Sequence, residues 1–149
     1  MKIDDNKIIH IGTEDDQLLT NVSVWKQKSM KFKITRSFDD HISLGVINSD
    51  YRTETFSWYN RRHKHVVYYT GKPGGGLMEA GNAYKMPGRG FQEGDEVIVE
   101  VNTDDGCINW YKNGELSLEY RMKSLKNPDI DWVFFILFHN QFDMVEILP

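Results

Sequence analysis

Apolar and polar residues alternate with a period of two along much of the chain, a pattern that predicts β-strands with one buried face. Residues 30–34, MKFKI, alternate large apolar side chains with lysines. After a turn at residues 37–40, the stretch 42–46, ISLGV, resumes the alternation. We therefore predict two strands joined as a hairpin, with the apolar set on one sheet face and the lysines in water.

A second group of alternating residues carries two tight-turn signals. Residues 96–101, EVIVEV, place three valines on one face, and Asp105-Gly106 then offers the positive φ values of a tight hairpin turn. The next short strand contains Trp110, which we expect in the core because a large inward aromatic removes much apolar area from water. Asn113-Gly114 is the strongest short hairpin signal in the chain. These turns predict a three-strand meander.

The rest of the chain contains a doubly apolar strand and two long irregular stretches. Residues 132–138, WVFFILF, are apolar on both faces, as expected for a strand covered on both sides, and residues 143–148 would form the last strand. The irregular stretches are residues 48–65 and 71–94, and loops this long are usually functional or packed by their own side chains. No helical period survives more than two turns. We predict an all-β fold, an antiparallel two-sheet β-sandwich, with a closed barrel as the alternative.

Composition and charge narrow the class of protein. The 149 residues suit a single domain, and with 40% apolar and 13% aromatic residues the chain can bury a sizeable core. A formal charge of −4 argues against general binding to nucleic acid or to an anionic membrane. No apolar run approaches the roughly 20 residues that span a bilayer, and the start has no apolar signal core. The single cysteine, Cys107, excludes an internal disulfide and fits a reducing, cytoplasmic location.

Few residues suggest catalysis or a metal site. The five histidines, at positions 10, 41, 63, 65 and 139, are scattered, and no H-E-x-x-H or G-x-S-x-G signature is present. Paired aspartates such as Asp104-Asp105 do not fit the spacing of a calcium loop. The glycines at residues 71–76 lack the order of a phosphate-binding loop. We therefore expect no catalytic residues, no cofactor and no metal.

The meander carries a resemblance to a known family. Residues 94–114, GDEVIVEVNTDDGCINWYKNG, resemble a SPRY domain, whose sequences carry a G-D pair, a strand, an acidic turn with glycine, a strand, an aromatic residue and K-N-G at this spacing. Residues 42–46 resemble the early strand of the family that ends in G-V, and residues 90–95 resemble its lead-in to the G-D pair. Residues 133–148 lie where its last two strands belong.

The resemblance covers about residues 22–148 within a single domain of residues 1–149, and it is strongest at residues 90–118. It implies a bent two-sheet sandwich of the concanavalin or jelly-roll type, with long loops at one end. It also implies a non-catalytic adaptor or scaffold module for protein–protein interaction. Such a module grips a peptide or protein surface and is often one domain of a larger protein or complex.

The candidate partner-binding residues come mainly from the first irregular stretch. Residues 61–65, RRHKH, form the one basic run and follow Trp58 and Tyr59. Aromatic and arginine side chains suit a single-stranded nucleic acid or an acidic or extended peptide, although a solvated loop is the simpler interpretation. The predicted contact residues are Tyr51, Arg52, Trp58, Tyr59, Arg61, Arg62, Tyr84 and Asn140. Carbohydrate binding by a lectin-like sandwich is the alternative function, and an enzyme of unassigned type is the third.

Overall fold

The computed structural model describes residues 1–149 except 54–64, 71–75, 81 and 86–89. The strands are β1 (Lys2–Asp4), β2 (Lys7–Ile9), β3 (Asp16–Ser23), β4 (Ser29–Arg36), β5 (Ile42–Asn48), β6 (Val66–Thr70), β7 (Gly76–Glu79), β8 (Asn82–Lys85), β9 (Glu96–Asn102), β10 (Cys107–Lys112), β11 (Glu115–Arg121), β12 (Trp132–Phe138) and β13 (Met144–Leu148). Two short 3-10 helices, η1 (Ser49–Thr53) and η2 (Lys123–Lys126), lie between strands of the described chain.

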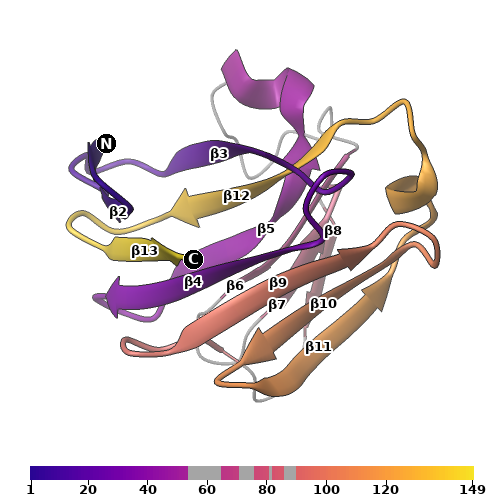
Figure 1. The fold of residues 1–149 in the computed structure, drawn as a ribbon. Helices are drawn as coiled ribbons and strands as arrows, with labels where there is room; N and C mark the ends of the chain where they lie inside the picture. The colour runs from indigo at the N-terminus through magenta and orange to yellow at the C-terminus, as the bar shows by residue number, and fades with distance from the viewer. Residues whose placement is uncertain (54–64, 71–75, 81, 86–89) are drawn as a thin grey trace.

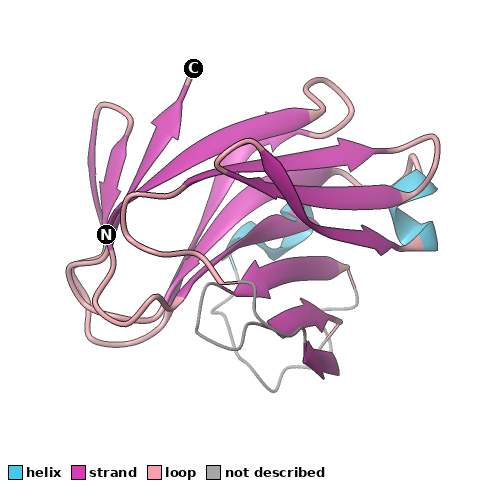
Figure 2. Ribbon diagram, turned by 90° about the horizontal axis from the view of Figure 1, so that it is seen from below, coloured by secondary structure: helices cyan, strands magenta, loops and turns pink. Residues whose placement is uncertain are grey.

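The described strands form two antiparallel sheets that lie face to face (Figures 1 and 2). The seven-stranded sheet has the order β1-β2-β13-β4-β9-β10-β11, and the six-stranded sheet has the order β3-β12-β5-β6-β7-β8. The predicted all-β sandwich is therefore confirmed. The closed barrel is excluded because each sheet ends in separate edge strands. Among the described residues, no helix is long and apolar enough to cross a bilayer.

Alternation along the strands creates the core between the sheets. In β4, Met30, Phe32 and Ile34 are buried, while Lys31 and Lys33 point to the opposite face, as predicted. The three valines of β9 follow the same rule. Each large apolar side chain removed from water stabilises the fold by about 1.5–3 kcal/mol. The period-two pattern thus identified which face of these strands is inside.

The predicted hairpin between residues 30–34 and 42–46 is wrong. Strands β4 and β5 lie in different sheets, with β4 between β13 and β9 and β5 between β12 and β6. The connection at residues 37–41 therefore crosses from one sheet to the other. Alternation specifies a buried face but not a pairing partner, and both strands bury their apolar faces in the shared core.

The three-strand meander is confirmed, with one correction to its first turn. Strand β10 pairs with β9 on one side and β11 on the other. At the second turn Asn113 and Gly114 both adopt positive φ, at 51° and 86°. At the first turn only Gly106 does so, at 68°. Four residues connect these strands, and the side-chain oxygen of Asn102 accepts two backbone N–H groups of the loop, so a second left-handed residue is not needed.

Several strands were missed in the sequence. The N-terminal strands β1 and β2 extend the seven-stranded sheet by pairing with β13, and β3 is an edge of the other sheet. Strands β7 and β8 lie within residues 71–94, which we had predicted to be irregular. These strands are three or four residues long except for β3, too short to show a period, and they depend on pairing with long-range neighbours.

The outer faces of the two sheets differ in character. The predicted double burial of residues 132–138 is confirmed: every residue of β12 is buried. On the outer face of the six-stranded sheet a second apolar cluster is formed by Leu19, Ile47, Val66, Tyr68, Val133, Phe135 and Leu137. Tyr51 of η1 and Met78 of β7 pack against this cluster. The six-stranded sheet therefore carries buried apolar side chains on both of its faces.

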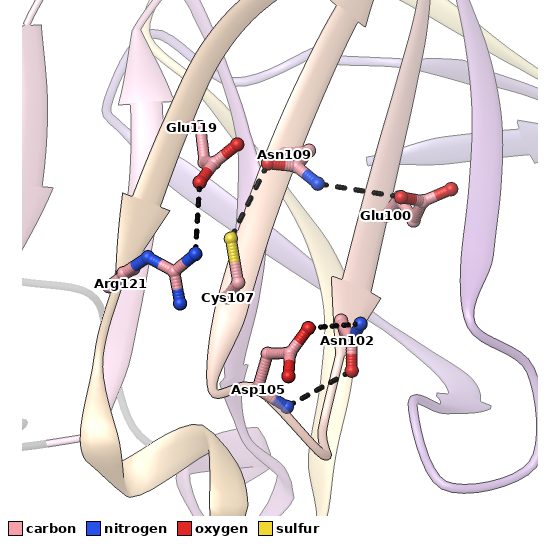
Figure 3. A network of polar contacts seen from close by, with 7 residues as sticks. All are labelled: Glu100, Asn102, Asp105, Cys107, Asn109, Glu119 and Arg121. Carbon is pink, nitrogen blue, oxygen red and sulfur yellow. Dashed lines mark hydrogen bonds and ion pairs between the residues drawn. The ribbon is translucent and has the colours of Figure 1, made fainter.

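The outer face of the seven-stranded sheet is polar, and its side chains bind one another (Figure 3). Asn109 of β10 lies between Cys107 and Glu100, accepting from the thiol at 3.5 Å and donating to the carboxylate at 3.4 Å. Glu119 and Arg121 of β11 form an ion pair at 3.6 Å. Burial, and next the Glu119 carboxylate, raise the pKa of the Cys107 thiol, which disfavours the reactive thiolate. We interpret this face as a stable surface that is exposed to solvent.

Candidate interaction surface at the loop end

Three connections between the sheets meet at one end of the sandwich, at the left of Figure 1. Residues 10–15 lead from β2 to β3, residues 37–41 from β4 to β5, and residues 139–143 from β12 to β13. Each of these loops passes from one sheet to the other. We call these three loops together the loop end.

Backbone hydrogen bonds join the first loop to the third. The His10 amide donates to the Asp143 carbonyl at 3.0 Å, and the Phe142 amide donates to the His10 carbonyl at 2.6 Å. The His10 ring, which is completely buried, lies with Nδ1 2.8 Å from the Asn140 carbonyl oxygen and donates to it. Backbone hydrogen bonds of this kind normally pair the strands of a sheet. Here they join the first loop to the third, so these two loops form one structural unit.

The middle loop is attached to the third loop through side chains. The Phe38 amide donates to Asp143 Oδ1 at 2.9 Å, and the Asn140 side-chain amide donates to Asp39. Asp143 is almost fully buried, which raises the pKa of its carboxyl, while the Phe38 amide opposes that rise. Deleting the Phe38 contact would remove a donor from the buried Asp143 carboxyl, whereas the Asp39 carboxyl is exposed and can bind water instead.

Two histidines, one from the second loop and one from the third, are in contact with each other. The His41 and His139 rings are stacked with their centroids 3.6 Å apart. His139 Nδ1 lies 3.3 Å from Asp15 Oδ1, and its Nε2 lies 3.2 Å from Ser43 Oγ. Burial, followed by the proximity of His41, lowers the pKa of His139 to about 4. A neutral imidazole therefore donates from Nδ1 to Asp15 and accepts from the Ser43 hydroxyl.

Ser43, His139 and Asp15 thus occur in the order of a nucleophile, a base and an orienting acid. Ser43, however, has no exposed surface, and a nucleophile must reach a substrate carbonyl. The arrangement instead satisfies a buried hydroxyl and a buried imidazole, which would each cost free energy if unpaired. We interpret it as a brace that links β5 and the first and third loops.

Three large apolar side chains project from the loop end. Ile11, Phe38 and Phe142 are exposed by 48%, 85% and 53%, one in each of the three loops. Phe38 forgoes most of the roughly 1.5–3 kcal/mol that burying a phenylalanine supplies. An open depression of about 540 Å³ is lined by Met1 and residues 10–16, so that Ile11 belongs to its wall. Large apolar side chains left exposed on neighbouring loops are typical of interaction sites.

Two residues in these loops have a left-handed backbone, and one of them is strained. Phe142 has a φ of 69° and Asp40 a φ of 60°, both in the left-handed region. Aspartate visits this region readily, but a bulky aromatic residue there costs about 1–2 kcal/mol. The hydrogen bond from the Phe142 backbone amide to the His10 carbonyl holds the strained residue in place. The conformation of the third loop, which exposes an aromatic side chain, therefore lowers the stability of the fold.

Comparison with known proteins places this arrangement in a fold. No protein-family model matches the sequence, and no curated protein shows a significant sequence match. The solved SPRY domain of human HERC1 superimposes with a TM-score of 0.71 at 17% identity, covering 97% of this chain and 88% of that one. This chain has the SPRY fold. Another human SPRY domain gives a TM-score of 0.76 at 15% identity over 98% of this chain and 92% of its own. The PSpry domain of TRIM65 gives 0.69 at 15% identity over 97% and 82%.

The SPRY fold is typically a protein-interaction module and is generally non-catalytic. Its recognition from residues 94–114 is confirmed, although the sequence identities are low. Because the structural match covers 98% of this chain, it includes most of the first 21 residues, which the sequence resemblance did not cover. Among the described residues, no group of three or more His, Cys, Asp or Glu side chains could hold a metal ion.

The SPRY sandwich separates the predicted contact residues that the structure describes. Tyr51 and Arg52 lie in η1, over β3 at one edge of the six-stranded sheet, where the Arg52 guanidinium donates to the carbonyls of Leu19 and Thr20, both at 2.9 Å. Tyr84 lies on β8, at the opposite edge of the same sheet, against Tyr120 of β11. These residues therefore do not form one surface together.

Asn140 is the predicted contact residue that lies at the loop end of the SPRY fold. Its carbonyl and its side-chain amide bind His10 and Asp39, so it connects all three loops. The remaining candidates, Trp58, Tyr59, Arg61 and Arg62, lie outside the described residues.

Sequence reasoning missed the exposed apolar residues of the loop end. Phe38 carried a usable signal, since it is a large apolar residue inside the polar turn SFDD. Phe142 stands between Gln141 and Asp143 in a similar polar setting. Ile11 was hidden because it follows the apolar strand residues of β2. Nothing in the local pattern places these three residues at the same end of the fold.

Proposed function

We propose that this chain is a protein-interaction module that binds a peptide or protein surface through the loop end. The observation that carries the proposal is the set of exposed side chains Ile11, Phe38 and Phe142 on three loops that are hydrogen-bonded to one another. Large apolar anchors, aromatic ones above all, supply most of the binding energy at protein interfaces. The SPRY fold, typically used for protein interaction, agrees with this role.

The bracing of the loops matters as much as their apolar side chains. A partner that binds a loop already fixed in shape avoids the entropic cost of ordering it. His10, Asn140 and Asp143 supply that order from buried or half-buried positions beneath the surface. We therefore assign these three residues to positioning and the exposed apolar residues to contact.

The outer face of the seven-stranded sheet is a weaker candidate for the contact surface. Its carboxylates and amides bind neighbours on the same face, as with Glu100, Asn109 and Asn102 (Figure 3). A partner would have to displace those bonds, and exposed ion pairs return little free energy. The arginines and aromatics of residues 58–62 remain a proposed second contact segment. A place within a larger protein or complex also remains a proposal.

The proposal is tested by photo-crosslinking from defined positions. A benzophenone-bearing phenylalanine analogue replaces Phe38, whose side chain is so exposed that the fold tolerates the change. Matched proteins carry the analogue at Leu116, an exposed residue of β11 outside the loop end, and at Trp58. After irradiation in a lysate of the native cell, adducts are identified by mass spectrometry, with unlabelled wild-type protein as competitor.

We expect competable adducts from position 38 and none from position 116. Adducts from position 58 would add the first irregular stretch to the surface. Equal labelling from positions 38 and 116, or no competable adduct from 38, would contradict binding at the loop end. A glycan array with and without chelator tests carbohydrate binding on the same protein, and saturable glycan binding would favour the lectin alternative.

A further inference from the structure

The loop end is acidic as well as apolar. Glu14 and Asp39 are exposed in these loops, Asp16 is exposed next to them at the start of β3, and Asp15 and Asp40 are half-buried. The three loops, residues 10–15, 37–41 and 139–143, contain no lysine or arginine, and the nearest basic residue in sequence is the exposed Arg36 at the end of β4. The whole chain has 18 basic and 22 acidic residues, so this concentration of one sign is local. A mainly acidic surface around apolar side chains selects partners by charge.

Part of this acidic charge already has a partner within the protein. Asp15 binds His139, and Asp39 accepts from the Asn140 side chain. Asp16 accepts from the adjacent Gln17 amide, which leaves its charge uncompensated. Within the described part of the chain, no ion pair involves Glu14, Asp16 or Asp40. Three carboxylates are therefore left for cations of a partner.

The acidic and apolar groups are interleaved along the loops. Glu14 and Asp16 line the same depression as Ile11. In the middle loop, Phe38 stands two residues before Asp40, whose backbone is held at positive φ. A cationic side chain of a partner could thus reach a carboxylate while its neighbour buries against an exposed apolar side chain. A neutral apolar partner would leave these carboxylates desolvated without a counter-charge, which disfavours it.

We propose that the loop end binds a basic, apolar segment of a partner protein, in which lysine or arginine stands close to large apolar residues. This inference rests on the proposed function and adds the chemistry of the partner. It is opposite in charge to the acidic segment predicted from residues 61–65, which lie at least partly outside the described residues. Charge complementarity here raises the rate of association and makes binding weaken with salt.

The test uses an array of random immobilised peptides probed with the fluorescently labelled whole chain. We expect the bound peptides to be enriched in lysine or arginine next to leucine, isoleucine or aromatic residues. Selected peptides are then synthesised and their affinities measured by fluorescence anisotropy at low and high salt. Affinity should fall as salt rises.

Variants then separate the partner chemistry from the binding site. Phe38→Ser should weaken binding of the selected peptides by about tenfold or more, as for an interface anchor. Glu14→Lys combined with Asp40→Lys should shift the enrichment from basic to acidic peptides. Leu116→Ser and Asp129→Lys, at exposed positions outside the loop end, are the controls and should change nothing.

Each outcome decides one of the two proposals. If Phe38→Ser weakens binding but the selected peptides are acidic or neutral, the basic-partner inference fails and the proposed function stands. If Phe38→Ser leaves binding unchanged, binding at the loop end is wrong and the inference falls with it. Absence of any peptide binding counts against both.

Discussion

Trp110 offers the sharpest test of how the sandwich is held together. Its side chain is fully buried between the sheets, and its Nε1 donates to the Leu44 carbonyl of β5 at 2.9 Å. It therefore connects the seven-stranded sheet to the six-stranded sheet by packing and by a hydrogen bond. Tyr69 of β6 lies next to it, with the ring centroids 5.9 Å apart.

The cost of Trp110→Ala follows from these contacts. A buried tryptophan removes about 150–250 Å² from water, which at about 25 cal/mol per Å² is about 4–6 kcal/mol. Alanine recovers a little of this, and large-to-small changes of this kind cost about 3–5 kcal/mol. Losing the donor to the Leu44 carbonyl adds about 1 kcal/mol. We expect a loss of about 5 kcal/mol in unfolding free energy, or about 10–20 °C in melting temperature.

Urea unfolding followed by far-UV circular dichroism measures this loss without relying on tryptophan fluorescence. Trp25 provides a matched control, since its Nε1 also donates to a backbone carbonyl, that of Ile130 at 2.9 Å, but its side chain is 40% exposed. Trp25→Ala should cost about 1–2 kcal/mol. Trp110→Phe keeps most of the apolar volume and should lose about 1–2 kcal/mol. If Trp110→Ala cost no more than Trp25→Ala, the assignment of Trp110 as the link between the sheets would be refuted.

Three further substitutions test other parts of the fold. Gly45→Ala would place a methyl group 2.0 Å from the Val67 carbonyl oxygen and 2.6 Å from Tyr68 Cα, so it should lower the unfolding free energy measured in urea by about 3 kcal/mol or more. Gly76→Ala is the control, because its new methyl group would have no contact shorter than 3.6 Å, and it should change the unfolding free energy by no more than about 1 kcal/mol. Equal effects of the two substitutions would contradict the packing of β5 on β6. The pKa of His139 is about 4 in the folded protein against an ordinary 6.5, so its contribution to stability is complete above pH 6.5 and falls as the pH drops toward 4, by about 2 kcal/mol between pH 7 and pH 5. The raised pKa of Asp143 has the opposite effect on the pH dependence of stability. His139→Gln should remove only the loss of stability at low pH that comes from His139. If His139→Gln left the pH dependence of the unfolding free energy unchanged, His139 would not be held neutral in the folded protein. Arg52→Ala should lower the unfolding free energy by about 1 kcal/mol, because it removes two hydrogen bonds to carbonyls of β3. Arg52→Lys should restore less than half of this loss, because one ammonium cannot span two carbonyls. A thermal melt of Arg52→Ala identical to that of the wild type would mean that the bonds to β3 are not maintained.

The candidate site was predictable only in part. The resemblance pointed to loops at one end of a sandwich, and Asn140 was named from one of the three loops that meet there. The remaining described candidates lie elsewhere because their neighbourhood depends on sheet order: Arg52 is next to β3, and Tyr84 is at the far edge on β8. Phe38 and Phe142 could have been noticed as apolar residues in polar turns. Their shared location could not have been seen.

The sequence by itself determined the strands with long alternating patterns, their buried faces and the Asn113-Gly114 turn. These features depend on contacts between residues close in the chain, where side-chain direction alternates with each residue and a turn of two residues fixes its own φ values. That is why Phe32 and Trp110 were placed inside correctly.

Only the tertiary structure decided which strands share a sheet and which loops share an end. Strands β4 and β5 follow one another in sequence but separate into different sheets, because each finds its hydrogen-bonding partners far along the chain, in β9 and β13 or in β6 and β12. The same crossing brings residues 37–41 beside residues 139–143. Hydrogen bonding between two strands depends little on their sequences, so it does not decide which strands pair. The strand order that buries all the apolar faces at once decides it. The position of the interaction surface follows from that strand order.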